Sequence, residues 1–445
     1  MIWFYYTIFA LVMALAGPFL LLQPKARIGL WQKFGIVPDA IASKIDTSRP
    51  AIWFHAVSVG EFNAIAPLLQ SFRTEHPDFQ IYVSTTTGTS QKLAKERVGD
   101  WATVFHFPFD LPWALRNWLN CIKPIAVVIA ETELWPGFAH ECSLRGIKSC
   151  IVNGRISPRS FKGYMRLRWL FQALLRQFAA VGVQSEQESL RYRTLGAKDS
   201  AVQVCGNMKF DGIKSLSATE QQVLRKKLNI GTTDLVIVGG STHESEESAL
   251  LEALAKLPAH CRLILAPRHP ERFARVSQIV QNHGYRPRRY SADEQFERQG
   301  DVYVLDTIGQ LTNFYSLSSI AFVGGTIAKI GGHSLIEPFA YSTPVVCGPH
   351  TEKTRDVASA LLQRNALLQV PDASALVETL KQLCDSESTR RRYGAAGREY
   401  LDQSQGAVQR TMNMLNSVLS TDRRLSSQPT GSSAPMQDDQ VRVEM

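Results

Sequence analysis

The sequence predicts an α/β protein with two doubly wound domains behind an apolar N-terminal helix. Short, continuous runs of Val, Ile and Ala alternate with longer amphipathic runs, as in parallel strands that are buried on both faces. This alternation occurs on either side of the polar stretch Lys214–Thr233, which indicates two tandem sheets covered by helices. Ile2–Leu22 contains no charged residue, and about 20 apolar residues suffice to cross a bilayer. We therefore divide the chain into a transmembrane anchor at residues 1–24, two domains at residues 25–213 and 214–420, and a tail at residues 421–445.

The N-terminal apolar run has the flanks of an uncleaved membrane anchor. Aromatic residues lie at its start and basic residues follow its end: Trp3, Tyr5 and Tyr6, then Lys25, Arg27 and Lys33. By the positive-inside rule, this distribution leaves the rest of the chain in the cytoplasm. A cleaved signal peptide is the alternative, but it would need a basic start and a small-residue cleavage site, and neither is evident. We therefore expect a single-pass anchor.

The chain carries an excess of basic residues and no cysteine framework. Its 445 residues have a formal net charge of +9, which favours an anionic partner such as a nucleic acid, an acidic lipid or a phosphorylated substrate. The seven cysteines are scattered without a C-x-x-C pair, so neither a disulfide framework nor a zinc site is indicated. No D-x-D motif, which commonly holds a divalent ion against a sugar diphosphate, is present. We therefore expect reduced thiols and a reaction that needs neither a metal nor another cofactor.

The first domain is predicted to contain seven strands and the second domain five. The strands of the first domain are expected at Ala51–Phe54, Gln80–Ser84, Thr103–Phe107, Ile125–Ala130, Lys148–Val152, Ala179–Val183 and Val202–Val204. Those of the second are expected at Leu235–Gly239, Arg262–Ala266, Val302–Leu305, Ile320–Val323 and Val345–Cys347. Helices are expected at Phe62–Thr74, Thr89–Arg97, Phe161–Phe178 and within Glu387–Leu419. From Thr421 onward Ser, Gln, Pro and Asp dominate, which predicts a disordered tail.

A glycine-rich segment of the second domain is the strongest local sign of a ligand. After the strand at Ile320–Val323 come a loop at Gly324–Gly332 and the predicted start of a helix near His333–Leu335. Glycines let the backbone approach a ligand closely, and a helix start favours an anion such as a phosphate. Glu337, one turn into that helix, could accept hydrogen bonds from sugar hydroxyls. The alternative is an ordinary glycine-rich βα turn, because no G-x-G-x-x-G motif follows the strand.

Charged residues follow three predicted strands of the first domain. Glu61 lies at a strand-to-helix turn, where it could act as a general base towards a sugar hydroxyl. Glu131 and Glu133 follow the fourth strand, where one of them could organise an active site or balance positive charge. Lys209 follows the seventh strand and could place a positive charge at a cleft. The alternatives are a first-turn glutamate favoured by the helix dipole, helix capping by Thr132 and Glu133, and a surface lysine.

Polar residues also follow the strands of the second domain. Gly239–Glu244 ends one strand with small hydrogen-bond donors, and Arg268 ends the next, where it could meet a phosphate or a base. Ile308-Gly309-Gln310 begins another helix. Each signal is weak alone. Because ligands of doubly wound proteins lie at the carboxyl ends of the strands, the common placement of these residues favours a binding site there.

The segment Arg159–Phe178 interleaves basic and aromatic residues. Such a helix could lie on an anionic membrane surface. The alternative is a two-sided helix that packs on the sheet with its arginines in solvent.

Seven motifs distributed along the chain resemble those of the 3-deoxy-D-manno-octulosonic acid (Kdo) transferases of lipopolysaccharide synthesis. They are HAVSVGE (His55–Glu61), AETELWP (Ala130–Pro136), NGRIS (Asn153–Ser157), GNMKFD (Gly206–Asp211), GGSTHESEE (Gly239–Glu247), APRHPERF (Ala266–Phe273) and VGGTIAKIGGHSLIEP (Val323–Pro338). The resemblance implies a GT-B glycosyltransferase fold, with a cleft between two Rossmann-like domains, on the cytoplasmic side of the inner membrane. It also implies transfer of Kdo from the donor CMP-Kdo to lipid IVA, the tetraacylated lipid A precursor, at the membrane and without a nucleic-acid partner.

The same resemblance implies roles for individual residues. Glu61 corresponds to the general base, and Glu131 and Lys209 correspond to groups that stabilise the transition state. The residues implied to bind CMP are Pro267, Arg268, Ile308, Gly309, Gln310, Ser334, Leu335, Ile336 and Glu337. The chain departs from the family where Gln310 replaces a common Glu, and where Ser334 replaces a common Asn and Ile336 stands in place of a Leu.

These roles describe one inverting displacement at the anomeric carbon of Kdo. A helix N-terminus, Arg268 and Lys209 could neutralise the single phosphate of CMP-Kdo without a metal. Two other functions stay open from the residues. One is another membrane-associated sugar-nucleotide enzyme, either a hexosaminyltransferase or an epimerase, and the other is a non-catalytic binding protein tethered to the membrane.

Overall fold

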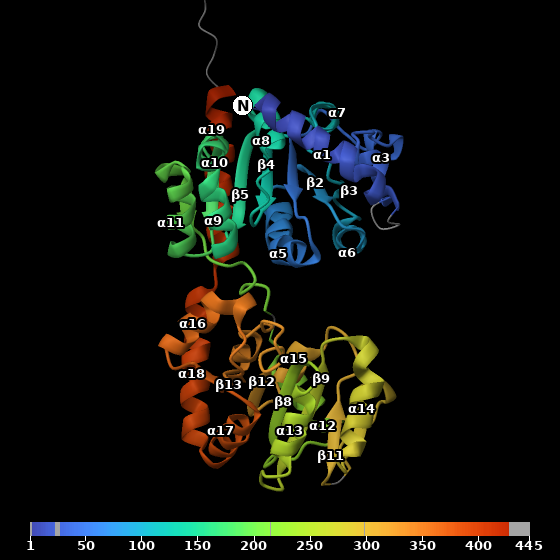
Figure 1. Ribbon diagram of the computed structural model, residues 1–445, viewed down its shortest axis with the longest axis vertical. Coiled ribbons are helices and arrows are strands. Elements are labelled where there is room, and N and C mark those ends of the chain that lie inside the picture. Colours follow the sequence, from blue (N-terminus) through green and yellow to red (C-terminus); the bar gives the residue numbers. More distant parts are fainter. Residues whose placement is uncertain (1, 23–26, 214, 298, 427–445) are drawn as a thin grey trace, which may run out of the picture. The chain divides into compact units, whose positions relative to one another are not determined.

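The computed structural model describes residues 2–22, 27–213, 215–297 and 299–426, which form two compact units (Figure 1). Unit 1 comprises the chain up to Met208 and the chain from Gly406 onward, and unit 2 comprises Lys209–Gln405. The sequence had suggested a boundary near residue 214. It did not indicate that the C-terminal helix returns to unit 1.

Unit 1 is built on a parallel sheet of seven strands in the order β3-β2-β1-β4-β5-β6-β7. The strands are β1 (Ala51–His55), β2 (Gln80–Thr85), β3 (Thr103–His106), β4 (Ala126–Ala130), β5 (Lys148–Gly154), β6 (Phe178–Val183) and β7 (Val202–Val204). Alternate side chains enter different cores, since Ile52 and Phe54 face one side of β1 and Ala51 and Trp53 face the other. This two-sided burial explains why β1 reads as an unbroken apolar run.

Helices cover both faces of this sheet. They are α1 (Ile2–Leu22), α3 (Leu30–Lys33), α4 (Asp39–Ala42), α5 (Val59–Glu75), α6 (Gly88–Val98), α7 (Pro112–Ile122), α8 (Pro136–Leu144), α9 (Pro158–Arg166), α10 (Arg168–Leu175), α11 (Glu186–Leu195) and α19 (Ala407–Ser426). Side chains of α5, α6 and α19 fill the core on one face, and those of α7, α8, α10 and α11 fill the core on the other.

Unit 2 repeats this plan with a second parallel sheet, in the order β10-β11-β9-β8-β12-β13-β14. Its strands are β8 (Leu235–Thr242), β9 (Cys261–Pro267), β10 (Arg286–Arg289), β11 (Asp301–Val304), β12 (Ile320–Val323), β13 (Val345–Cys347) and β14 (Leu367–Gln369). Its helices are α12 (Ala218–Lys227), α13 (Glu246–Leu254), α14 (Phe273–Asn282), α15 (Leu311–Tyr315), the short 3-10 helix η4 (Glu337–Tyr341), α16 (Arg355–Gln363), α17 (Ala373–Asp385) and α18 (Glu387–Ser404).

All twelve predicted strands are confirmed, with ends that shift by at most three residues. The sequence did not reveal β10 and β14. β10 reads Arg-Pro-Arg-Arg and looks like a loop. It pairs with β11 because the buried carboxylate of Asp301 on β11 forms ion pairs with Arg286 at 2.6 Å and Arg288 at 3.4 Å.

The helix expected over Phe161–Phe178 is wrong in its length. The chain forms α9 and α10, which meet at Leu167, and Phe178 already belongs to β6. Leu167 has φ −115° and ψ 33°, outside the helical range, so the helix is interrupted there. α9 buries none of its residues, whereas Phe171, Leu174 and Leu175 of α10 are buried.

The prediction of disorder from Thr421 is wrong over its first six residues, because α19 continues to Ser426. The rest of the predicted tail lies outside the described residues. α19 packs on α5, β5 and β6, and Figure 1 shows it as the red helix that runs through unit 1. Met412 and Leu415 of α19 are buried in the core beneath this face of the sheet.

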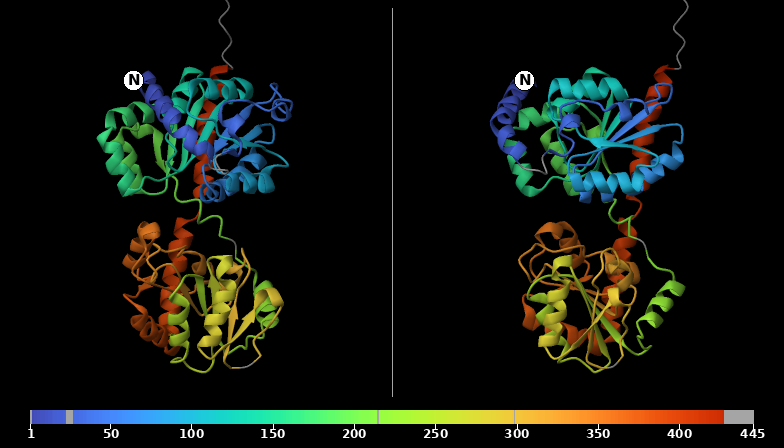
Figure 2. Two further views of the ribbon diagram at one scale, coloured as in Figure 1. Left: turned by 45° about the vertical axis from the view of Figure 1, so that its right-hand side comes forward. Right: turned by 90° about the vertical axis from the view of Figure 1, so that its right-hand side faces the viewer.

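The apolar run at the start of the chain is helical as predicted, over Ile2–Leu22. Among the residues that the structure describes, no helix combines the length and the apolar character needed to span a membrane. The expected transmembrane anchor at residues 1–24 is therefore not supported. α1 instead lies on the outside of unit 1, next to α8 (Figure 2), where the hydroxyl group of Tyr5 donates to Asp110 at 2.6 Å.

Candidate functional site

Each sheet has one point at which the strand order reverses direction. In unit 1 this point lies between β1 and β4, and in unit 2 it lies between β8 and β12. Helices and loops leave the two neighbouring strands in opposite directions at such a point, so a crevice forms at their carboxyl ends, and ligands of doubly wound folds bind there. Among the predicted site residues, Glu61 follows β1, Glu131 follows β4 and the segment Ser334–Glu337 follows β12.

Glu61 lies in the first turn of α5, directly after β1. The hydroxyl group of Ser58 accepts a hydrogen bond from the Glu61 amide at 3.3 Å and donates to the Glu61 carboxylate at 3.0 Å. The same carboxylate accepts from the Val57 amide at 2.8 Å. Ser58 therefore caps α5, and its hydroxyl group and the Val57 amide hold the Glu61 carboxylate in one orientation. These bonds do not exclude a role as a base, because a carboxylate has about four acceptor positions.

Glu131 follows β4 and has a left-handed backbone conformation, with φ 55°. Its amide donates to the Val152 carbonyl at 2.9 Å, and its own carbonyl accepts from the Tyr192 hydroxyl at 3.1 Å. A non-glycine residue with positive φ is uncommon and is retained where surrounding bonds enforce it. The backbone around Glu131 is thus held by β5 and α11, the elements that carry these two partners.

Three carboxylates gather at the β1–β4 switch point. Burial and then the charges of Glu61 and Glu131 raise the pKa of Glu133 to about 7. Glu61 and Glu131, which the sequence predicted as site residues, therefore both lie near Glu133 within unit 1. The sequence placed Glu133 beside Glu131 as a possible site carboxylate, but the resemblance implied no role for it. The paired carboxylates of the E-T-E motif were the available signal.

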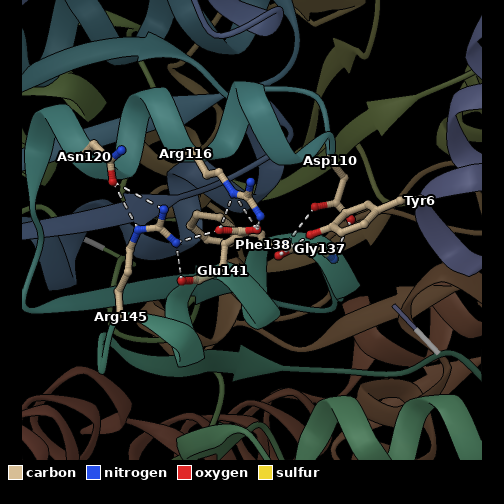
Figure 3. A network of polar contacts seen from close by, with 8 residues as sticks. All are labelled: Tyr6, Asp110, Arg116, Asn120, Gly137, Phe138, Glu141 and Arg145. Atoms are coloured by element: carbon tan, nitrogen blue, oxygen red, sulfur yellow. Dashed lines mark hydrogen bonds and ion pairs between the residues drawn. The ribbon is translucent and has the colours of Figure 1, made fainter. Parts of the chain in front are cut away.

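A buried polar network fixes the helix that follows this acidic segment (Figure 3). Asp110 caps α8 by accepting from the amides of Gly137 at 2.8 Å and Phe138 at 2.7 Å. On the next turn, the buried Glu141 carboxylate forms ion pairs with Arg116 at 3.0 Å and Arg145 at 2.6 Å. Burial alone would raise the pKa of Glu141, but hydrogen bonds from both arginines lower it below its usual value. Together these contacts hold the start of α8 and the segment that leads into it.

The acidic segment also contacts the loop after β5. The hydroxyl group of Thr132 donates to the carbonyl oxygen of Arg155. Ile156, the next residue, donates its amide to the buried Glu188 carboxylate at 2.7 Å. The loop that carries Arg155 is therefore held beside the acidic segment.

Lys209 does not belong to this group of side chains in unit 1. It is the first residue of unit 2, in a turn after β7, and its side chain is exposed. Lys209 therefore belongs to a different unit from Glu61 and Glu131.

In unit 2, the predicted CMP-binding residues come from three segments, and a side-chain hydrogen bond joins two of them. The hydroxyl group of Thr312 on α15 donates to the Glu337 carboxylate at 3.0 Å. This bond joins the turn Ile308–Gln310, which precedes α15, to the segment Ser334–Glu337. Burial raises the pKa of Glu337, although hydrogen bonds from Ser334 and Thr312 oppose this effect. Ser334, which replaces the Asn common in the family, thus bonds to the Glu337 carboxylate.

Pro267 and Arg268 lie at the end of β9. Pro267 is buried, whereas Arg268 is exposed, and the Arg268 amide donates to the carbonyl oxygen of Thr242 at 3.1 Å. Ile308 is also exposed, with 77% of its surface accessible, and Gly309 has φ 84°.

The glycine-rich loop is organised differently from the prediction. No α-helix opens near His333–Leu335, and the chain forms only the 3-10 helix η4 from Glu337. The amide groups of the loop point at the fully buried carboxylate of Glu246. That carboxylate accepts from the amides of His243, Gly325, Thr326, Ile327 and Ala328, at 2.8 to 3.1 Å. A protein carboxylate therefore occupies the amides of Gly325–Ala328, and the helix start near His333–Leu335, which the sequence predicted as the part that favours an anion, is not formed.

Two family models together match most of the chain. The model described as 3-deoxy-D-manno-octulosonic-acid transferase (kdotransferase) matches residues 28–212. The model described as glycosyl transferases group 1 matches residues 220–400. The boundary between the two matches lies close to the boundary between the units.

Curated relatives match over nearly the same length. A protein of Haemophilus influenzae named 3-deoxy-D-manno-octulosonic acid transferase is 33% identical, over 92% of this chain and 96% of the relative. A protein of the same name from Chlamydia trachomatis is 30% identical, over 83% of this chain and 86% of the relative. Among solved structures, UDP-GlcNAc 2-epimerase from Neisseria meningitidis has a TM-score of 0.57 over 82% of this chain and all of that chain. At 12% identity this likeness concerns the fold alone, which is of the GT-B type.

Proposed function

Because the chain belongs to the Kdo transferase family, we propose that it transfers Kdo from CMP-Kdo to lipid IVA by an inverting displacement. The chain is a glycosyltransferase of lipopolysaccharide biosynthesis. The acceptor, the stereochemical course and the roles of individual residues are the proposed parts.

The observation that carries this proposal is the group of glutamates at the β1–β4 switch point. In the proposed reaction, the acceptor hydroxyl attacks the anomeric carbon of Kdo and Glu61 takes the hydroxyl proton. The bond from the anomeric carbon to the phosphate oxygen breaks, and its electron pair leaves with CMP. Glu131 balances positive charge that develops on the sugar, and Lys209 and Arg268 balance the charge on the phosphate.

Recognition of CMP is assigned to unit 2. Glu337 has a buried carboxylate held by Thr312, so it is oriented to accept hydrogen bonds from the ribose hydroxyls. The exposed turn Ile308–Gln310 lies beside it and offers backbone groups for the base. Pro267 and Arg268 lie at the end of the adjacent strand β9, where Arg268 meets the phosphate.

The acceptor is a lipid, and we propose that unit 1 works at a membrane surface. One side of α1 exposes large apolar side chains at helical spacing: Phe4, Ile8, Leu11, Val12 and Leu15. α9 and the start of α10 add exposed Met165, Leu167 and Trp169 beside basic residues. An apolar face flanked by positive charge binds anionic lipid surfaces.

The decisive assay combines the purified protein with CMP-Kdo and lipid IVA, followed by mass spectrometry of the lipid. The wild-type protein should add Kdo, and Glu61→Gln should lower the rate by about 10²- to 10⁴-fold because the base is lost. Binding of CMP to Glu61→Gln should persist. Glu96→Gln, an exposed residue paired with Lys92, serves as the control. Full turnover by Glu61→Gln would overturn the role of Glu61.

Nucleotide preference separates the proposed donor from its alternatives. Protection of the protein against heat by CMP and not by UDP supports Kdo transfer. Protection by UDP alone would point to a hexosaminyltransferase or an epimerase. Binding of CMP without any transfer to lipid IVA would contradict the proposed acceptor.

A further inference from the structure

Two histidines lie against each other at the switch point of unit 2. His243 directly follows β8, and His333 ends the glycine-rich loop that follows β12. Their Nε2 atoms are 2.8 Å apart, and the two rings are parallel within 2° with centroids 5.1 Å apart. β8 and β12 are the parallel neighbours between which the strand order reverses. The imidazole pair therefore lies where this fold binds its ligands.

The short Nε2–Nε2 distance determines how protons are arranged in the pair. One ring must donate through Nε2–H and the other must accept. At most one of the two rings can therefore carry protons on both nitrogens. The accepting ring then carries its proton on Nδ1, and the donating ring has a basic Nδ1. The neutral pair thus offers one N–H donor and one site that can take up a proton.

The surroundings of the pair are rich in positive charge. Charged and titratable groups that act on the two rings are His269, Arg268, Arg272, Glu247 and Lys353. Glu247 is fully buried and bonded to Arg272 at 2.7 Å, so it offsets that arginine. Burial, and then His243 and Arg268, lower the pKa of His333 to about 4, and burial also lowers the pKa of His243. The pair is therefore neutral near pH 7, but an approaching anion would favour its protonated form.

The backbone holds the two rings in place. The Gly332 amide donates to the Gly325 carbonyl at 2.7 Å, which folds the loop back so that His333 lies beside Gly325. A Cβ atom at Gly325 would lie 3.0 Å from the His333 ring and 3.5 Å from that of His243. The Glu246 carboxylate anchors both sides, because it accepts from the amides of His243 and Gly325.

We propose that the His243–His333 pair binds the phosphate of the sugar nucleotide and takes up a proton as that phosphate becomes the leaving group. This inference rests on the proposed function, in which the leaving group is a nucleoside monophosphate. It assigns a role to two residues that have none in the reaction described above.

The charge balance of the reaction explains why such a pair is useful. The phosphate of the donor is a diester with one negative charge. When the bond to the anomeric carbon breaks, the electron pair stays on the bridging oxygen, and the acceptor proton goes to Glu61. The released monoester has a second pKa of about 6, so it gains nearly one negative charge at neutral pH. A proton taken from solvent by the pair compensates this charge and converts an N–H hydrogen bond into a charge-assisted one.

Calorimetry of CMP binding tests the proposal on the intact protein. At about pH 8, free CMP is already a dianion, so protons taken up on binding must go to the protein. Because the pair is neutral before binding, the phosphate must raise its pKa, and titrations in buffers of different ionisation enthalpy should then show net uptake of protons as CMP binds. Cytidine, which lacks the phosphate, should cause no uptake. Binding of CMP without proton uptake would overturn the proposal.

Variants locate the proton. His243→Gln and His333→Gln should abolish the uptake and weaken CMP binding about tenfold, because a charged hydrogen bond is lost. His283→Gln is the matched control, since His283 directly follows α14 and its ring contacts the carbonyl oxygen of Ile279 in that helix. Uptake that persists in both pair variants would refute the assignment. Nitrogen NMR of the wild-type histidines avoids dependence on variant folding, and rings that stay neutral with CMP bound would also refute it.

The outcomes separate this inference from the proposed function. If UMP binds in place of CMP, the proposed donor is wrong. Proton uptake on binding of UMP then tests the proposed role of the histidine pair. If CMP binds and Kdo is transferred while no proton is taken up, the proposed function stands and the role of the pair fails. If neither nucleotide binds, both fail.

Discussion

The environment of Glu133 differs from that of an ordinary helix-capping glutamate, which is exposed to solvent. Glu133 lies near Glu61 and Glu131, and burial with these two charges raises its pKa to about 7. A raised pKa means that the folded protein favours the protonated carboxyl group. The contribution of Glu133 to the free energy of unfolding therefore falls as pH rises from its unfolded pKa, near 4.5, through 7.

Replacing Glu133 with Gln should remove this pH dependence. At about pH 8 we expect Glu133→Gln to be more stable than the wild type by about 2 kcal/mol, and the gap should shrink to less than about 1 kcal/mol near pH 5. Urea unfolding at both pH values measures the gap. Glu96→Gln, on the exposed face of α6, should show no comparable change. An equal gap at both pH values would contradict the raised pKa.

Glu246 holds the glycine-rich loop by accepting five amide hydrogen bonds while fully buried. Replacing it with Gln would turn one acceptor oxygen into an NH₂ group that faces these amides. We expect a loss of about 2 to 4 kcal/mol in the stability of unit 2. Calorimetric melting measures this loss, with the exposed Glu244→Gln as control. A change of similar size in both variants would show that burial of Glu246 is not the cause.

The start of α8 depends on a side chain that lies outside the helix. Its first residues have no side-chain cap of their own, and Asp110 supplies the cap while it also accepts from Tyr5 of α1. Burial raises the pKa of Asp110 to about 6. One carboxylate therefore connects α1 to the start of α8 and to the acidic segment that precedes it.

Asp110→Ala should destabilise unit 1 by about 1 to 2 kcal/mol, the usual effect of removing a helix cap. Hydrogen exchange at the amides of Gly137 and Phe138 should accelerate, because both lose their acceptor. Tyr5→Phe removes only the hydroxyl group and should leave these two amides protected. Equal acceleration in both variants would mean that α1, and not the cap, protects the start of α8.

The exposed apolar face of α1 makes a separate prediction about lipid binding. Changing Leu11 and Leu15 to Asp should prevent flotation with anionic vesicles, because the apolar contact area is lost. Val223→Asp changes an exposed apolar residue of α12 in the other unit and should leave flotation intact. Flotation of the Leu11 and Leu15 variant at the wild-type level would exclude this face as the lipid contact.

Considered as a whole, the chain crosses between its two units twice. The first crossing is at Met208 and Lys209, and the second is at Gln405 and Gly406. After the second crossing, α19 completes the core of unit 1 with Met412, Met414, Leu415 and Leu419. The C-terminal segment is therefore required by the N-terminal unit.

A chain that ends at Gln405 should lose stability in unit 1 selectively. Each large buried apolar side chain that is removed costs about 2 to 5 kcal/mol, so unit 1 should melt well before unit 2 in calorimetry. CMP should still raise the melting temperature of unit 2. A chain that ends at Ser426 keeps α19 and is the control. Unchanged melting of unit 1 in the shorter chain would contradict the role of α19.

Several features of this protein follow from residues close together in sequence. The predicted strands are confirmed because strands buried on both faces need continuous apolar runs, and such runs are visible locally. Glu61 and Glu131 were found in the same way, since each directly follows a strand. The motifs that resemble Kdo transferases are also local, and they identified the family.

The remaining features depend on partners far away in the chain. β10 forms because Asp301 neutralises its arginines, the loop after β12 encloses the Glu246 carboxylate, and α19 belongs to the unit at the other end of the chain. The proximity of His243 and His333 is of the same kind, because 90 residues separate them. The sequence alone determined twelve of the strands, the two sheets and the family, since apolar runs and motifs act through neighbouring residues. Only the tertiary structure decided which charges meet, because desolvation and pairing depend on the residues that folding brings together.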